Sequence, residues 1–116
     1  MPKNKNLVVL IREDPSKNHR AAEAIRIAIG LSTGPNPLQI ILTGNARSLV
    51  TENAYELPDG EMLEKYLPVI QNLQIPVFVE DESSEQFSFE QDISVQKIPK
   101  SKIENILEIA DRVLIF

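Results

Sequence analysis

The sequence predicts an α/β fold, a three-layer α/β/α sandwich around a mostly parallel five-stranded sheet. Short apolar runs without alternation, such as residues 7–11, have the pattern of strands that are covered on both faces. Between them lie segments whose apolar residues recur at steps of three and four, which is the spacing of an amphipathic helix. Because strands and helices alternate, we expect right-handed crossovers within one domain over residues 1–116.

Turn-forming residues separate the predicted elements. Gly34-Pro35 closes the first helix and Gly44-Asn45 stops the second strand, while Ser101 and Glu104 form a capping box that opens the last helix. Pro68 lies inside a helical segment and is expected to kink it. The expected strands cover residues 7–11, 38–43, 75–79, 93–98 and 111–116, and the expected helical segments cover about 21–31, 46–50, 60–73 and 101–110.

The inward-facing residues of these elements should form a single hydrophobic core, because a chain of this length holds one domain. We expect the core to contain Val8, Leu10, Ile25, Ala28, Ile40, Leu42, Leu67, Ile70, Val77, Val79, Leu107, Val113 and Ile115.

The composition excludes several classes of function. The 116 residues include no cysteine, which excludes disulfides, thiolate zinc sites and a sulfur nucleophile on this chain. A formal net charge of −5 argues against nucleic acid as a partner, because phosphate backbones bind basic surfaces. Neither of the common glycine-rich phosphate-binding motifs occurs, so we expect no cofactor.

No apolar run reaches the length that spans a membrane. The run that follows the basic N-terminus ends at Arg12, which is too soon for an export signal. We therefore expect a cytoplasmic protein with no membrane partner.

The net negative charge is concentrated in residues 80–92, which hold six carboxylates and no lysine or arginine. Several carboxylates at the end of a strand are a possible site for Mg²⁺ or Ca²⁺, but the spacing is not that of an EF-hand loop. We interpret the segment as a solvated loop or as a docking surface for a basic partner, and we expect no metal site.

A candidate binding site lies where the predicted strands end, because ligands of α/β sheets bind at the carboxyl ends of strands. Arg12 follows the first strand, where Lys17 and Arg20 add positive charge, and an ion pair between Arg12 and Glu80 is possible if their strands are neighbours. The turn at Thr43-Gly44-Asn45 is either a site where backbone N–H groups bind an anion or an ordinary turn, since Gly-Asn commonly follows a strand. The candidate residues are Arg12, Thr43, Gly44, Asn45, Glu80 and Asp81. They support an alternative function, a small-molecule or divalent-metal-binding protein or enzyme.

His19 is the only histidine and lies near the start of the first helix. It has the chemistry of an acid, a base or an anion ligand, but no serine or second titrating group is visibly paired with it. We interpret it as a lone surface histidine.

The chain resembles the DsrE/DsrF-like sulfur-relay family over nearly its whole length. The resemblance is carried by residues 7–11, the helical stretch Ala24-Ile25-Arg26-Ile27-Ala28-Ile29-Gly30-Leu31, the strand Ile75-Pro76-Val77-Phe78-Val79 and the closing Ala110-Asp111-Arg112-Val113-Leu114-Ile115-Phe116. The closing stretch is the most specific part. The resemblance implies a DsrE/F-like domain.

Members of this family that carry sulfur hold a persulfide on a cysteine at the end of the third strand, and the resemblance places Glu80 at that position. A carboxylate cannot form a persulfide, so carrier activity and any catalytic residue are not expected here. Other members lack the cysteine and assemble with a cysteine-bearing partner. The resemblance therefore implies a non-catalytic subunit in a homo-oligomer, trimer or hexamer, or in a hetero-oligomer with a cysteine-bearing homologue.

Overall fold

A parallel sheet forms the centre of the molecule. The computed structural model describes residues 5–51, 54–81 and 95–116. Its strands are β1 (Leu7–Ile11), β2 (Leu38–Leu42), β3 (Val77–Glu80), β4 (Val95–Ile98) and β5 (Arg112–Ile115). They lie in the order β4-β3-β2-β1-β5, and all four neighbouring pairs are parallel. The predicted α/β fold is confirmed, with an entirely parallel five-stranded sheet.

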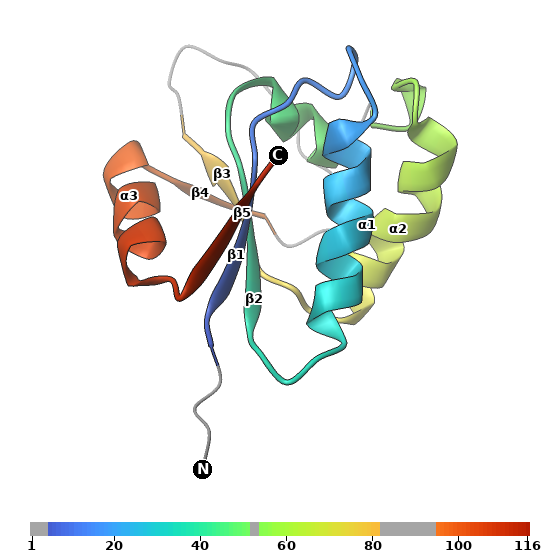
Figure 1. Ribbon diagram of the computed structural model, residues 1–116. Helices are drawn as coiled ribbons and strands as arrows, with labels where there is room; N and C mark the ends of the chain where they lie inside the picture. Colours follow the sequence, from blue (N-terminus) through green and yellow to red (C-terminus); the bar gives the residue numbers. More distant parts are fainter. Residues whose placement is uncertain (1–4, 52–53, 82–94) are drawn as a thin grey trace.

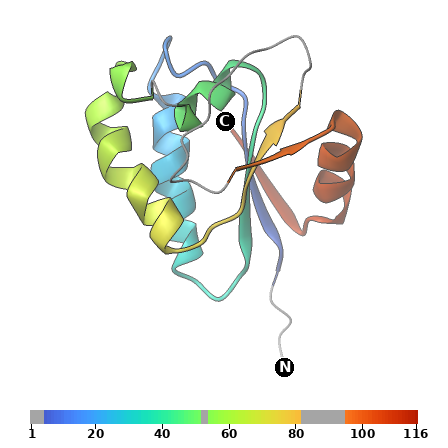
Figure 2. The same cartoon turned by 180° about the vertical axis from the view of Figure 1, so that it is seen from behind.

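Helices cover the sheet on both faces, which makes the three layers visible in Figures 1 and 2. One face carries α1 (Arg20–Ser32) and α2 (Gly60–Asn72), and the other carries α3 (Lys100–Ile109). Two short 3₁₀ helices, η1 (Gly44–Val50) and η2 (Ala54–Glu56), connect β2 to α2. Among the described residues, no helix is long and apolar enough to cross a membrane.

The hydrophobic core has two parts, one on each face of the sheet. The larger part lies under α1 and α2 and includes Val9 and Ile11 of β1, while the smaller part lies under α3 and includes Val8 and Leu10. Alternate residues of β1 thus serve opposite faces, as the geometry of a strand requires. Most of the predicted core residues are buried as expected.

Three predicted core residues are not fully buried, and two of them lie on β5. Val113 is 37% exposed and Ile115 is 58% exposed, while Leu107 of α3 is half-buried. The reason is topological: β5 is an edge strand bonded only to β1, and the core under α3 is built from β1, β2 and β4. An apolar strand has the same sequence pattern at the centre of a sheet and at its edge, so the prediction of burial was wrong here.

Two predicted boundaries also differ. The last helix begins at Lys100 after Pro99, with no side-chain cap, so the predicted capping box of Ser101 and Glu104 is wrong. The backbone N–H groups of Lys102 and Ile103 donate to the Pro99 carbonyl at 3.0 and 3.2 Å, so the helix starts directly from the end of β4. The third strand is shifted to Val77–Glu80, and residues 93–94 of the predicted fourth strand lie outside the described residues.

Gly60 and Gly30 should respond in opposite ways to substitution by alanine. A Cβ at Gly60 would overlap the backbone carbonyl of Tyr55, whereas a Cβ at Gly30 meets nothing within 4 Å. We expect Gly60→Ala to lower the free energy of unfolding by about 1–3 kcal/mol because of overpacking. Gly30→Ala should raise it by about 0.5–1 kcal/mol, since alanine favours the interior of a helix. Urea denaturation of both variants measures this, and a stable Gly60→Ala protein would contradict the packing described.

Candidate functional site

The predicted site residues lie along the carboxyl edge of the sheet, but they do not form one cluster. Arg12 follows β1, Thr43 follows β2 and Glu80 ends β3, and the strand order places β2 between the other two. Neighbouring strands are about 4.8 Å apart, so the backbones of β1 and β3 are separated by roughly 10 Å. No ion pair joins Arg12 to Glu80 in the part of the chain that the structure describes. The predicted ion pair required neighbouring strands, and this condition is not met because β2 lies between β1 and β3.

A buried arginine that the sequence analysis missed connects the turn after β2 to the end of β3. Arg47 of η1 is only 2% exposed. Its Nε donates to the Gly44 carbonyl at 2.8 Å and its Nη1 donates to the Glu80 carbonyl at 3.0 Å. The only sequence signal was one charged residue among the apolar residues of a short helix. The guanidinium therefore connects the start of η1 to the end of β3 through two main-chain carbonyls.

The predicted turn Thr43-Gly44-Asn45 is held by contacts within the protein. Gly44 has a φ of 56°, a left-handed conformation that favours glycine. The Nδ2 of Asn45 donates to Oδ2 of Asp14 at 3.2 Å. The turn therefore ties the end of β2 to the loop that follows β1.

Glu80 and Asp81 stand apart from the other candidates. Glu80 is half-buried as the last residue of β3, and Asp81 is exposed, with its backbone N–H donating to the Ile98 carbonyl at 2.9 Å. Within residues 5–51, 54–81 and 95–116, no group of three His, Asp or Glu side chains is placed to hold a metal ion. The rest of the acidic loop lies outside the described residues.

Asp14 organises the loop between β1 and α1. Its Oδ1 accepts from the Ser16 backbone N–H at 2.9 Å and from the Ser16 hydroxyl at 2.7 Å. These bonds to Ser16 lower the pKa of Asp14, with smaller contributions from the charge of Lys17 and the amide of Asn45. The loop that carries Arg12 and His19 is thus fixed at its centre by a carboxylate.

The interpretation of His19 as a lone surface histidine is wrong. Its Nδ1 lies 2.7 Å from Oδ1 of Asp59. His19 is 79% exposed in its side chain, whereas that of Asp59 is 10% exposed. The two residues are 40 positions apart and precede α1 and α2 respectively, so the pair joins the starts of two helices. Neither periodicity nor a motif in the sequence indicates a contact over that distance.

Neither residue of this pair uses its side chain to cap its own helix. His19 and Asp59 occupy the N-cap positions of α1 and α2, and neither makes a side-chain cap hydrogen bond. An aspartate at an N-cap normally accepts from the first turn and stabilises the helix by about 1 kcal/mol. Here the Asp59 carboxylate faces the histidine instead.

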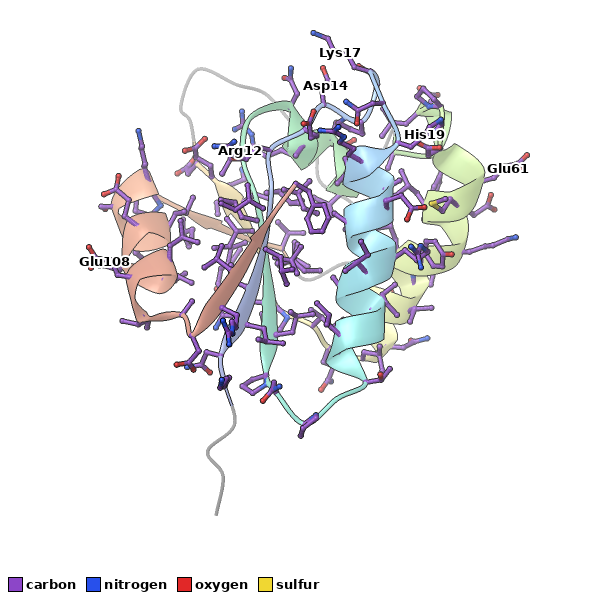
Figure 3. The ribbon with its side chains drawn as sticks, in the orientation of Figure 1. Arg12, Asp14, Lys17, His19, Glu61 and Glu108 are labelled. Atoms are coloured by element: carbon purple, nitrogen blue, oxygen red, sulfur yellow. The ribbon has the colours of Figure 1, made fainter. Side chains whose placement is uncertain are left out.

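A cavity of about 700 Å³, lined in part by His19, lies at the carboxyl edge of β1 and β5. Arg12 and His19 lie at this end of the sheet, near the start of α1 (Figure 3). The cavity combines charged groups with an apolar wall. Its lining residues are Arg12, Glu13, His19, Arg20, Glu23, Ile115 and Phe116.

Comparison with known proteins identifies the fold. No known family matches the sequence by its family model, and no curated protein matches it either. The crystal structure of the YchN protein from E. coli is similar to this structure with a TM-score of 0.79, covering 97% of this chain and 99% of YchN. The chain has a DsrE-like fold. At 16% sequence identity, the likeness concerns the fold and leaves the function of this DsrE-like chain to be argued from its own residues.

Arg47 should be among the least replaceable polar residues of the molecule. We expect Arg47→Met to lower the free energy of unfolding by about 3 kcal/mol, because it removes the donors to the Gly44 and Glu80 carbonyls. The matched control is Arg26→Gln, which breaks an exposed ion pair with Glu23 and should cost less than about 0.5 kcal/mol. Equal losses for the two variants in urea denaturation would contradict the role given to Arg47.

Asp14 should titrate below its ordinary pKa of 3.8. Because the folded-state pKa is lowered, ionised Asp14 stabilises the native loop above the unfolded pKa, and this stabilisation is lost as the pH falls through the folded pKa. The effect on global stability should be small, since the carboxylate is near the surface. An NMR pH titration of the Asp14 carboxyl carbon measures it, with the Ser16 amide signal following the same midpoint. A midpoint at or above 3.8 would show that these hydrogen bonds do not persist in solution.

Proposed function

We propose that this chain is a non-catalytic, oligomer-forming subunit with a DsrE-like fold, acting in a cytoplasmic sulfur-transfer or related complex. Its contribution is surface and not chemistry. The observation that carries the proposal is the exposed apolar edge strand β5, on a chain that has no cysteine.

The absence of a thiol supports the non-catalytic part of the proposal. A persulfide is carried on a cysteine sulfur, and this chain has none at any position. The end of β3 presents the half-buried carboxylate of Glu80. A subunit of a sulfur-transfer complex that cannot hold sulfur itself would act by binding a subunit that does.

The two edges of the sheet differ in a way that supports assembly through β5. The β4 edge exposes Gln96 and Lys97, and a charged edge resists pairing with another strand. The β5 edge is exposed at every residue, and after Arg112 it presents only Val113, Leu114 and Ile115. An exposed apolar edge strand is avoided in a monomer, because its unpaired backbone groups invite another chain.

Both faces of β5 are available to a partner. Val113 and Ile115 are in register with Val8 and Leu10, which face α3, whereas Leu114 is in register with Val9, which faces α1. A strand from a second chain would extend the sheet by backbone hydrogen bonds and bury these side chains at once. We propose a second copy of this chain as the occupant, paired β5 to β5 about a two-fold axis as one contact of a hexamer, whereas a homo-trimer would need another contact surface. A cysteine-bearing homologue with the same fold is the hetero-oligomeric form of the proposal.

The alternative function, a small-molecule or metal-binding site beside Glu80, has less support. The main-chain carbonyl of Glu80 already accepts from Arg47, and Arg12 lies on the far side of β2. The side chains at this edge that do share a cavity are those around His19.

Lysine substitutions on β5 should dissociate the assembly without unfolding the chain. We expect the purified protein at micromolar concentration to have a multiple of its 13.1 kDa mass by light scattering. Val113→Lys combined with Ile115→Lys should lower this mass by breaking the β5 contact, with an unchanged circular dichroism spectrum, because both side chains are exposed. The matched control, Gln96→Lys on β4, should leave the oligomer intact.

The hetero-oligomeric form has its own measurement. Co-expression with a cysteine-bearing homologue of the same fold should give a complex of defined stoichiometry that the β5 double variant does not form. A wild-type chain that is monomeric at micromolar concentration, alone and with such a homologue, would overturn the proposed function.

A further inference from the structure

We propose that the cavity at the carboxyl edge of β1 and β5 binds a small organic carboxylate, with Arg12 and Arg20 pairing with the carboxylate group and Phe116 contacting its apolar body. This inference goes beyond the assembly proposed above, although Ile115 of β5 also lines the cavity. A cavity of about 700 Å³ lies within the range that small-molecule sites occupy.

Among the charged side chains around the cavity, the arginine N–H donors have fewer partners than the glutamate oxygens. Both of the cavity's side-chain carboxylates already have partners: Glu23 Oε2 accepts from Nε and Nη2 of Arg26 at 3.0 and 2.7 Å, and Arg26 does not line the cavity. Glu13 accepts from Asn18 at 3.1 Å and lies 3.6 Å from Arg20.

The arginines are less engaged than these acids. Arg12 forms no ion pair within the described residues, and Arg20 forms only the 3.6 Å pair, through one of its nitrogens. Guanidinium groups with free N–H donors pair with carboxylates in a bidentate geometry. The cavity is therefore suited to an added anion.

The wall that carries Arg12 is fixed by backbone hydrogen bonds. The N–H groups of Arg12 and Glu13 both donate to the Phe116 carbonyl, at 2.7 and 3.3 Å, and the Phe116 N–H donates to the Leu10 carbonyl at 2.9 Å. These bonds hold the arginine and the aromatic residue on adjacent backbones at one rim. A ligand with an anionic group and an apolar body would contact both, whereas inorganic phosphate would leave the apolar wall unused.

His19 is the third group at the cavity, and Asp59 positions it. The Asp59 carboxylate at Nδ1 fixes the imidazole orientation and leaves Nε2 as the nitrogen with no partner among the described residues. The other oxygen of Asp59, Oδ2, is buried and has no hydrogen-bond partner in the described part of the chain. A buried oxygen without a donor lowers the free energy of unfolding by about 1–3 kcal/mol. The Asp59 carboxylate therefore positions His19 at a cost in stability near the start of α2.

Benzoate, inorganic phosphate and neutral benzamide are suitable probes. We expect saturable binding of benzoate by the full chain, with NMR shifts at the amides of Arg12, His19 and Phe116, and much weaker binding of the other two. Arg12→Gln and Arg20→Gln should each weaken benzoate binding about tenfold or more, as loss of a charge-assisted pair implies. The matched control is Lys17→Gln, because Lys17 is exposed on the same loop, points outward and does not line the cavity (Figure 3).

Asp59→Asn tests the positioning role. It should weaken benzoate binding and also change the ring ¹⁵N shifts of His19, which a purely structural role would leave unchanged. Equal binding of benzoate and benzamide, stronger binding of phosphate than of benzoate, no saturable binding at all, or equal affinity in Arg12→Gln and Lys17→Gln would each overturn the proposal. None of these variants lies on β5, and although Ile115 also lines the cavity, assembly is measured by mass and this site by benzoate binding, so the two tests can fail separately.

Discussion

The pairing of β5 with β1 is the contact on which both surfaces of interest depend. It brings the last residues of the chain beside the first strand, where Phe116 exchanges backbone hydrogen bonds with Leu10 and Arg12. The backbone groups on one side of β5 are hydrogen-bonded to β1 in this way, and those on the other side lie at the open edge of the sheet. The same strand therefore helps to line the cavity at its carboxyl end and presents an apolar edge along its unpaired side. Ile115 belongs to both, since it lines the cavity and is 58% exposed.

Polar contacts between distant residues fix the loops at the carboxyl edge. Arg47 connects the turn after β2 to the end of β3, Asn45 connects that turn to Asp14, and Asp59 connects α2 to His19. Each contact crosses from one βα unit to another. Parallel sheets place their loops together at one edge, and these bonds define which loops touch there. They form one group around Arg47 and one around His19, and the bond from Asn45 to Asp14 joins the two.

The sequence was sufficient for the fold because the fold depends on patterns that repeat along the chain. An unbroken apolar run, such as residues 7–11, indicates a strand that is buried on both faces. Helical spacing, as around Ile25, indicates a helix that is buried on one face. The sequence could not predict the exposure of β5, because an apolar strand has the same pattern whether or not a helix covers Val113 and Ile115. It was also insufficient for His19, since the contact with Asp59 spans 40 residues and depends on how α1 packs against α2.

The backbone at the end of β3 is held by interactions that do not involve the side chain of Glu80. The end of β3 is held by the bond from Arg47 to the main-chain carbonyl of residue 80 and by the parallel pairing of β3 with β2 and β4. Neither interaction depends on the side chain at that position. A cysteine or a glutamate there would leave the same backbone in place, although only the cysteine can hold sulfur. The DsrE-like fold is therefore compatible with a chain that has no cysteine.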